Sequence, residues 1–222
     1  MSLDIDAPYF SDLGEAGLLC EFAPGPLDDA RQARIWAMAE ALQGDTGLRD
    51  IVPGMNNIAV LFAPETCDPQ ALRARITALW NAPQGRAAPT RVVEVPVIYG
   101  GADGPDLAEI SARAGLTAME FASRHAAADY TVYALGAQPG FAYMGGLPPE
   151  LATPRRDVIH PRVEAGSIII GGAQAGIQAC TTPSGWHIIG RTDLVLFDPQ
   201  RDPPNLLAPG DRVRFVAQEI TA

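Results

Sequence analysis

Residues 130–191 read YTVYALGAQPGFAYMGGLPPELATPRRDVIHPRVEAGSIIIGGAQAGIQACTTPSGWHIIGR, and they are the most informative part of the chain about its fold. Glycines and prolines recur along it and separate aromatic and arginine side chains. Glycine frees the backbone and proline fixes it, so a segment punctuated this often does not form long helices. The stretch therefore predicts short β-strands joined by tight turns that hold aromatic and polar side chains in place.

The second half of the chain continues this β pattern. We expect strands at residues 131–135, 166–170, 178–181, 187–190, 194–197 and 212–216. Many short strands separated by turn residues are typical of a sandwich or a barrel. We therefore predict a β-barrel-like domain at residues 130–222.

Residues 1–98 alternate between strand and helix patterns instead. Asp28 or Asp29 is placed to cap one helix, and Asp68 followed by Pro69 is placed to cap a second. Strands are expected at residues 17–22, 48–52, 58–62 and 92–99. The order strand, helix, strand, strand, helix, strand is that of a ferredoxin-like domain.

Between these domains, residues 99–129 predict a helical linker. One short helix is expected from Asp106 to about Gly115. A second begins at Thr117, where Glu120 completes a capping box. The predicted class is thus α+β, with a ferredoxin-like domain at 1–98, the linker at 99–129 and the barrel at 130–222.

Composition excludes several kinds of chemistry. The chain has 222 residues, 47 % of them hydrophobic, which is enough for a substantial core. The net charge of −10 argues against nucleic-acid binding through a basic surface. All 16 basic residues are arginine, so the chain has no P-loop lysine, no Schiff-base lysine and no lysine for biotin.

The cysteines and histidines form no metal-binding motif. Cys20, Cys67 and Cys180 are widely spaced, and no pair of the three histidines has ligand spacing. Free thiols fit a reducing compartment. The first residues lack the pattern of a signal peptide, and no apolar run approaches membrane-spanning length. We expect a cytoplasmic protein without a metal.

Several short motifs occur in an order that is typical of one protein family. They are PGFAYMGGL at residues 139–147, ATPRR at 152–156, PR at 161–162, AGS at 165–167, GW at 185–186, IGRT at 189–192 and PGD at 209–211. On these residues the chain resembles the family of the 5-oxoprolinase B subunit, allophanate hydrolase subunit 1 and the KipI-type kinase inhibitors.

This resemblance implies a cyclophilin-like β-barrel and a larger companion subunit of related fold, with a third subunit in the 5-oxoprolinase assembly. It implies an ATP-dependent amide or lactam hydrolase, first of all 5-oxoprolinase, which converts 5-oxoproline to glutamate. ATP would be used by the assembled complex. Two alternatives stay open: an inhibitor of a histidine kinase, and half of a biotin-dependent urea carboxylase or allophanate system.

The chain also departs from the pattern of that family. Glu164 stands where proline is usual, Gln178 replaces tyrosine, Ser184 replaces glycine and His160 replaces threonine, and His187 is unexpected. Several of these positions lie near the expected pocket, so they affect the choice of substrate more than the fold.

Arginines are the first candidates for binding an anionic substrate. A guanidinium offers a rigid fork to a carboxylate or a phosphate, and 5-oxoproline carries a carboxylate. We predict this function for Arg155 and Arg162. For Arg156 and Arg191 we favour structural contacts with backbone carbonyls or acidic neighbours.

Two further residues are candidates for catalysis. His125 would serve as a general base, or would end a helix and form structural hydrogen bonds. Gln174, in a glycine-rich turn, would polarise a carbonyl or stabilise the turn. Phe141, Tyr143 and Trp186 are predicted to wall the substrate site, although such aromatic residues are often part of a core.

Overall fold

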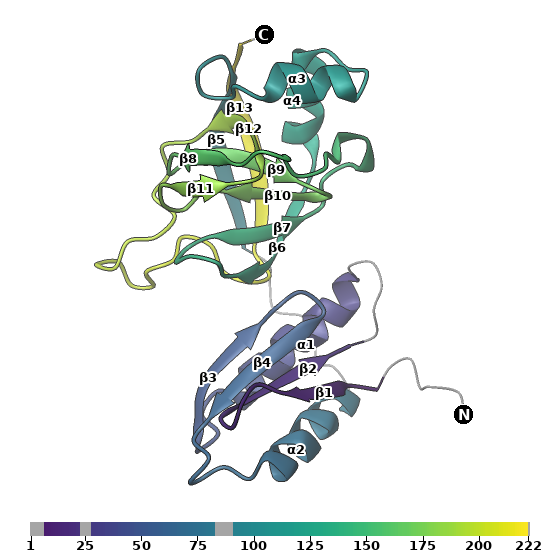
Figure 1. Ribbon diagram of the computed structural model, residues 1–222, viewed down its shortest axis with the longest axis vertical. Coiled ribbons are helices and arrows are strands. Elements are labelled where there is room, and N and C mark those ends of the chain that lie inside the picture. Colours follow the sequence, from purple (N-terminus) through teal and green to yellow (C-terminus); the bar gives the residue numbers. More distant parts are fainter. Residues whose placement is uncertain (1–6, 23–27, 83–90, 222) are drawn as a thin grey trace. The chain divides into compact units, whose positions relative to one another are not determined.

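The structure is a computed structural model that describes residues 7–22, 28–82 and 91–221 (Figure 1). The chain divides into two compact units, Met1–Pro89 and Thr90–Ala222, each with its own hydrophobic core. The expected α+β class is confirmed. Residues 92–99 therefore belong to the second unit, whereas the prediction places residues up to 98 in the first domain.

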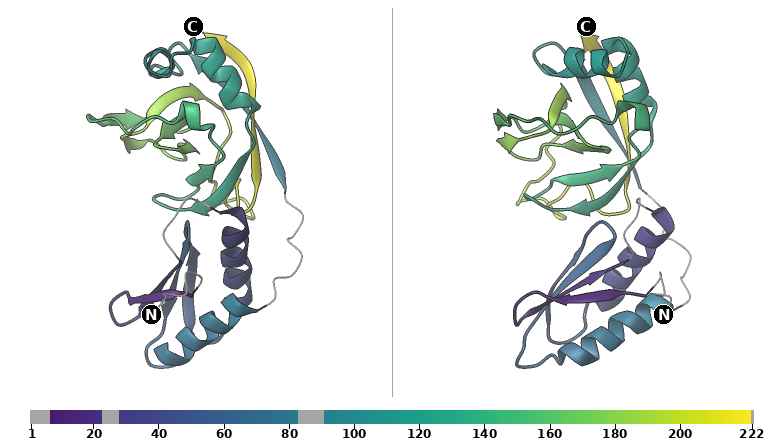
Figure 2. Two further views of the ribbon diagram at one scale, coloured as in Figure 1. Left: turned by 90° about the vertical axis from the view of Figure 1, so that its right-hand side faces the viewer. Right: turned by 45° about the vertical axis from the view of Figure 1, so that its right-hand side comes forward.

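The first unit is a four-stranded antiparallel sheet with two helices on one side (Figure 2). Its strands lie in the order β1-β2-β4-β3. The elements are β1 (Tyr9–Asp12), β2 (Gly17–Glu21), α1 (Asp29–Leu42), β3 (Leu48–Pro53), β4 (Asn57–Phe62) and α2 (Pro69–Asn81). The core forms where the apolar side chains of the helices meet one face of the sheet.

Both helices begin where the sequence predicted. The side chain of Asp28 accepts a hydrogen bond from the backbone N–H of Arg31 at 2.7 Å. Asp68 accepts one from the backbone N–H of Gln70 at 2.9 Å, with Pro69 at the first helical position. These caps satisfy N–H groups that have no partner inside the helix.

The strand expected to complete this sheet belongs to the other unit, so the ferredoxin-like strand order is corrected at that point. Strand β5 (Val92–Gly100) pairs in parallel with β13 (Arg212–Thr221) and antiparallel with β12 (His187–Arg191). In the first unit, the edge position beside β2 is occupied by β1, a strand that we did not predict. The apolar alternation of residues 92–99 identified a strand but contained no information about its distant partners.

The second unit is built on a closed barrel of seven strands in the order β10-β7-β6-β13-β5-β12-β9. A two-stranded ribbon is formed by β8 and β11. The remaining strands are β6 (Tyr130–Leu135), β7 (Ala142–Gly145), β8 (His160–Val163), β9 (Ser167–Gly171), β10 (Gln174–Ile177) and β11 (Thr182–Ser184), and a short 3₁₀ helix spans Pro149–Leu151.

Two of the predicted strands do not form. Residues 178–181 connect β10 to β11, and the side chain of Gln178 donates to the carbonyl of Cys180 at 3.0 Å and to Oγ1 of Thr182 at 2.5 Å. Residues 194–197 make a single bridge, from Phe197 to Asn205. Gln178 still exchanges backbone hydrogen bonds with Gly166 and Ser167, at 2.8 and 2.9 Å, just past the end of β10. Strands β7 and β8 form although we did not predict them, because β7 pairs with β6 and β10 and β8 pairs with β11.

The predicted helical linker is part of the barrel unit. Helix α3 (Leu107–Arg113) packs against β12 and β5, and helix α4 (Ala118–Ala127) packs against β13. Phe121 and Ile110 are fully buried in the same core as the strands, which we call the main core. The predicted capping box is present at Thr117. The helices therefore close over the barrel and do not act as a separate linker.

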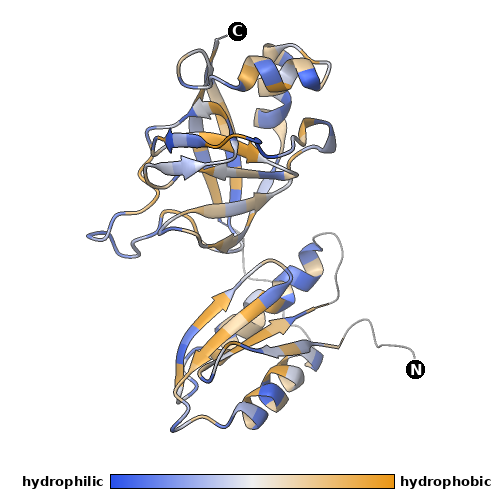
Figure 3. Cartoon of the chain, viewed as in Figure 1, coloured by the Kyte–Doolittle hydropathy of each residue, from blue (hydrophilic) through white to orange (hydrophobic). Residues whose placement is uncertain are grey.

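Strand β9 is buried on both faces, as its three consecutive isoleucines suggest, and Figure 3 shows how apolar and polar residues are distributed over the strands. Ile168 and Ile170 point into the main core, whereas Ile169 points outward and packs in a second cluster with Val163 of the ribbon. Successive side chains of a strand face opposite ways, so one strand supplies two separate apolar regions.

Candidate functional site

Three aromatic residues predicted to wall a site meet on the outer side of the barrel. The ring centroid of Phe141 lies 4.8 Å from that of Tyr143 and 5.9 Å from that of Trp186, and the Tyr143 and Trp186 centroids are 6.3 Å apart. All three pairs meet edge to face, which suits the charge distribution of aromatic rings. We call these residues the aromatic cluster.

Two glycines make room for these rings. A Cβ atom at Gly171 would lie 2.5 Å from the ring of Trp186, closer than real atoms approach. One at Gly176 would lie 3.2 Å from the ring of Phe141 and 3.3 Å from that of Trp186. The rings thus rest on bare backbone of β9 and β10. Gly171 ends β9 and Gly176 lies inside β10, where glycine is typical of a close approach by other groups, but the sequence did not indicate which rings use the space.

A cation and an amide adjoin the cluster. The guanidinium carbon of Arg155 lies 5.6 Å from the centroid of the Trp186 ring, within the range of a cation–π contact, and Arg155 is exposed. Gln174 stands directly opposite Gly171 in the β9–β10 hairpin. Directly opposed residues project from the same face of a sheet, so Gln174 shares the face against which Trp186 packs.

Arg162 lies elsewhere. Along β8 the buried Val163 faces the cluster, and the neighbouring Arg162 faces solvent with 71 % of its side chain exposed. Its Nε donates to Oε1 of Glu164 at 2.6 Å, and this hydrogen bond lowers the pKa of Glu164. The structure therefore does not assemble the predicted pair of arginines: one of them is at the cluster and the other is in a surface ion pair.

His125 is enclosed in the main core, which corrects its prediction as a general base. Its side chain is 0 % exposed, and its Nδ1 lies 2.8 Å from the hydroxyl of Tyr99. The rings of Tyr130 and Phe215 pack around it. Burial disfavours the charged imidazolium and lowers the pKa of His125 to about 3. This histidine has the structural role that is the alternative prediction for it.

Both arginines predicted to be structural contact acidic neighbours, and Nη2 of Arg191 lies 3.9 Å from Oδ1 of Asp193. Nη1 of Arg156 donates to the buried carboxylate of Asp106 at 2.7 Å, as a structural role requires. Arg191 lines a hollow of about 570 Å³ on the outer side of β5, together with Asp103 and Asp193. One guanidinium with two carboxylates does not favour an anion, so the cluster with Arg155 suits an acidic substrate better.

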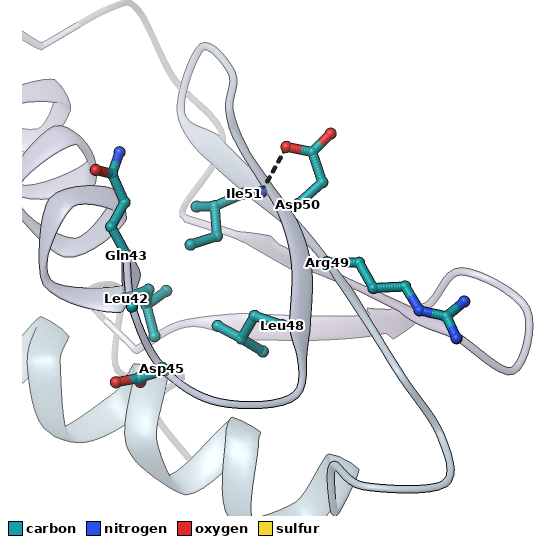
Figure 4. A pocket seen from close by; sticks show the side chains of 8 residues that line it. Leu42, Gln43, Asp45, Leu48, Arg49, Asp50 and Ile51 are labelled. Carbon is teal, nitrogen blue, oxygen red and sulfur yellow. Dashed lines mark hydrogen bonds between the residues drawn. The ribbon is translucent and has the colours of Figure 1, made fainter.

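Another hollow, of about 360 Å³, lies in the first unit between the end of α1 and strand β3 (Figure 4). Leu42, Leu48 and Ile51 line it with aliphatic carbons. Asp50 accepts a hydrogen bond from the backbone N–H of Ile51 at 2.9 Å, and Arg49 points away from the aliphatic groups. No cation of the described lining points into this hollow, so it does not suit an acidic ligand either.

Neither a metal-binding cluster nor a membrane-spanning helix occurs in the described part of the chain. In residues 7–22, 28–82 and 91–221, no three metal-ligating side chains gather as a cation site would require. Across the same residues, none of the helices combines the length and the apolar character needed to cross a bilayer.

The order of residues along the chain agrees with one family. The pattern of the carboxyltransferase domain, subdomain C and D, matches residues 8–207. The chain belongs to this family. It is similar to the 5-oxoprolinase B subunit of Escherichia coli O157:H7, which is 44 % identical over 208 residues and is matched over 93 % of this chain and 94 % of its own length.

Two further relatives of this carboxyltransferase-domain family support the assignment. The 5-oxoprolinase B subunit of Haemophilus influenzae is 39 % identical over 94 % of this chain and 97 % of its own length. The crystal structure of TTHA0988 superimposes with a TM-score of 0.81 and 37 % identity over 92 % of this chain. The present chain spans only 40 % of the length of TTHA0988.

Positions where the chain departs from the expected family pattern form local hydrogen bonds. Oγ of Ser184 accepts from the backbone N–H of Trp186 at 3.2 Å. Nε2 of His187 lies 2.9 Å from the carbonyl oxygen of Pro154. Both contacts lie beside the aromatic cluster in the sequence, next to Trp186 and next to Arg155. The departures thus shape the surroundings of the cluster and leave its aromatic residues in place.

Proposed function

We propose that this chain is the B subunit of a 5-oxoprolinase, an enzyme that opens 5-oxoproline to glutamate with ATP. The observation that carries the proposal is the 44 % identity to a 5-oxoprolinase B subunit along 93 % of this chain and 94 % of the relative. A match over more than nine-tenths of both chains supports a shared activity more strongly than a match of fold, because fold alone does not determine function.

Within that activity, the aromatic cluster is the proposed contact with substrate. Arg155 binds the carboxylate of 5-oxoproline or a phosphate of its activated form, since a guanidinium matches either group. Gln174 donates to the lactam carbonyl or accepts from the lactam N–H, because its amide has both kinds of group. The rings of Tyr143 and Trp186 pack against the apolar carbons of the substrate.

The proposed enzyme needs further subunits. Its relatives are named as one subunit of an enzyme, which implies at least one partner, and we propose a larger companion of related fold together with a third subunit. This chain contains no lysine, so the phosphates of ATP are held by arginine or by another subunit. His125 is not part of the catalytic groups that we propose, since its ring is enclosed.

The proposal is tested by reconstitution. The purified chain and its companion subunits are assayed separately and together for ATP-dependent conversion of 5-oxoproline to glutamate, and we expect activity only in the mixture. Substituting Arg155→Ala in the mixture lowers kcat/KM by about 10- to 100-fold, the usual cost of losing a charged hydrogen bond. Arg162→Ala is the matched control and stays at the wild-type rate. An inactive full mixture contradicts the proposal.

A further inference from the structure

A buried carboxylate, Asp106, ties together three segments of the second unit. Its Oδ1 accepts from Nη1 of Arg156 at 2.7 Å, and its Oδ2 lies 2.8 Å from Nε2 of His160. The same Oδ2 accepts from the backbone N–H of Ile188 at 2.7 Å, and the backbone N–H of Asp106 donates to the Ile188 carbonyl at 3.0 Å. The side chain of Asp106 is only 7 % exposed. Such a buried charge needs these partners, so they hold one another in place.

Two of these partners belong to the segment Thr153–His160, which we call the arginine loop. At its start, Thr153 and Gly172 exchange backbone hydrogen bonds of 3.0 and 2.7 Å. In its middle, the backbone N–H of Arg156 donates to the carbonyl of Gly185 at 2.8 Å. Asp106 then binds the loop through the side chains of Arg156 and His160. The loop is therefore fixed on both sides of Arg155.

These contacts fix the position of Arg155 in the arginine loop. It lies between Thr153 and Arg156, is exposed, and has its guanidinium carbon 5.6 Å from the Trp186 centroid. The anchoring contacts come from its neighbours, so its own guanidinium remains turned to the aromatic cluster. Asp106 also holds Ile188, which packs with Trp186 in the same buried group. One carboxylate thus fixes both the loop that carries the cation and the strand beneath the ring.

We infer that Asp106 is a positioning residue that holds the arginine loop so that Arg155 stays over Trp186. A preorganised cation binds an anion better than a mobile one, because the entropy of ordering is not lost on binding. The identity of the anion rests on the proposed function, whereas the link from Asp106 to Arg155 rests on the contacts alone.

The first test uses the assembled enzyme. Asp106→Asn keeps the size of the side chain and removes its charge, and we expect the KM for 5-oxoproline to rise about tenfold with little change in kcat. Because Asp106 acts through Arg155, the double variant with Arg155→Ala is no worse than Arg155→Ala alone. Glu109→Gln, an exposed carboxylate on helix α3, is the matched control and leaves KM unchanged. If the increase in KM of the double variant is the product of the increases in the two single variants, the inference is overturned.

The second test needs no activity. In the isolated chain, the NMR signal of the Trp186 indole N–H, identified with Trp186→Phe, reports the guanidinium beside the ring. We expect Asp106→Asn to move this signal as Arg155→Ala does. If Asp106→Asn does not fold, Arg156→Gln replaces it, since it breaks the same ion pair.

The outcomes separate the two proposals. A Trp186 signal that responds to Arg155→Ala but not to Asp106→Asn or Arg156→Gln overturns the positioning role. If Arg155→Ala leaves KM unchanged in an active complex, the cluster is not the substrate contact and that part of the proposed function is wrong. In that case, a Trp186 signal that shifts in both the Asp106 and the Arg155 variant still supports positioning of Arg155 by Asp106.

Discussion

The main core and the aromatic cluster are built by the two faces of the same strands, yet they differ in almost every property. The main core encloses His125 and the hydroxyl of Tyr99 among apolar side chains. In the aromatic cluster, Phe141 and Trp186 are buried and Tyr143 is half-buried, the rings rest on glycine backbone, and the exposed Arg155 lies at the edge. One face excludes charge, while the other keeps a cation within reach of a ligand.

This contrast shows that residue type alone is a poor guide to function in such a barrel. A histidine and an arginine were both predicted to be functional, but the histidine lies in the core and the arginine lies beside the cluster. A strand alternates its faces with every residue, so a shift of one position decides which environment a side chain meets.

The largest expected effect is on the main core. Phe121→Ala removes a fully buried ring and lowers the free energy of unfolding of the second unit by about 3–5 kcal/mol. The measurement is urea unfolding followed by the Trp186 indole signal. Met119→Ala on the same helix is the control, because Met119 is 50 % exposed and its loss changes stability by less than about 0.5 kcal/mol. Equal losses for the two variants would remove the distinction between core and surface here.

The next largest effect is the loss of stability of the second unit at acid pH. The pKa of His125 is about 3 in the folded unit and about 6.5 in an unfolded chain. The unfolded chain therefore binds a proton that the folded unit excludes. The contribution of His125 is complete above pH 6.5 and falls, by on the order of 1 kcal/mol per pH unit, as pH drops from there toward 3.

The control for the acid prediction is His125→Gln, which cannot titrate. Unfolding of the wild type and of the variant is measured between pH 7 and pH 5. We expect the wild type to lose stability more steeply on acidification. Parallel curves would mean that His125 is protonated in the folded unit and that its site is open to water.

A smaller effect is expected from the floor of the aromatic cluster. Gly171→Ala places a Cβ 2.5 Å from the Trp186 ring, and such overpacking costs about 1–3 kcal/mol of stability. It also displaces the ring, so binding of 5-oxoproline weakens. Gly185→Ala is the control, because its Cβ would meet its nearest neighbour at an ordinary 3.5 Å. Wild-type behaviour of Gly171→Ala would show that the ring does not need bare backbone.

The smallest effect belongs to Arg162. Its ion pair with Glu164 is exposed to solvent, and pairs of this kind contribute little to stability. Arg162→Ala is therefore expected to leave both the urea midpoint and the affinity for 5-oxoproline unchanged. Loss of affinity in isothermal titration would return Arg162 to the substrate site.

Local features of the fold were predictable because their causes are local. The caps at Asp28, Asp68 and Thr117 depend on residues within three positions, and each was found where the sequence placed it. The turns and short apolar runs also predicted the barrel strands β6, β9, β12 and β13, but not β7 or β10. Strand 92–99 was recognised as a strand, but its partners at residues 187–191 and 212–221 were not.

For the candidate site, the aromatic residues and Arg155 were predicted and found together. Arg162 was predicted to lie with Arg155 but lies away from the cluster. Successive side chains of β8 face opposite ways, so Val163 points inward and Arg162 points outward. Asp106 was identified only as the start of a helix. Its partners lie 50, 54 and 82 residues away along the chain, so their meeting was not visible in any local pattern.

Capped helices, turns rich in glycine and proline, and apolar strands arise from short-range forces, and these features and the family were readable from the order of residues. The neighbours of each strand, the face that each strand encloses, and therefore the polar residues that can meet a ligand became known from the three-dimensional arrangement. The physical reason is that capping and turn formation act over a few residues, whereas burial and pairing depend on contacts between segments that are distant in the chain.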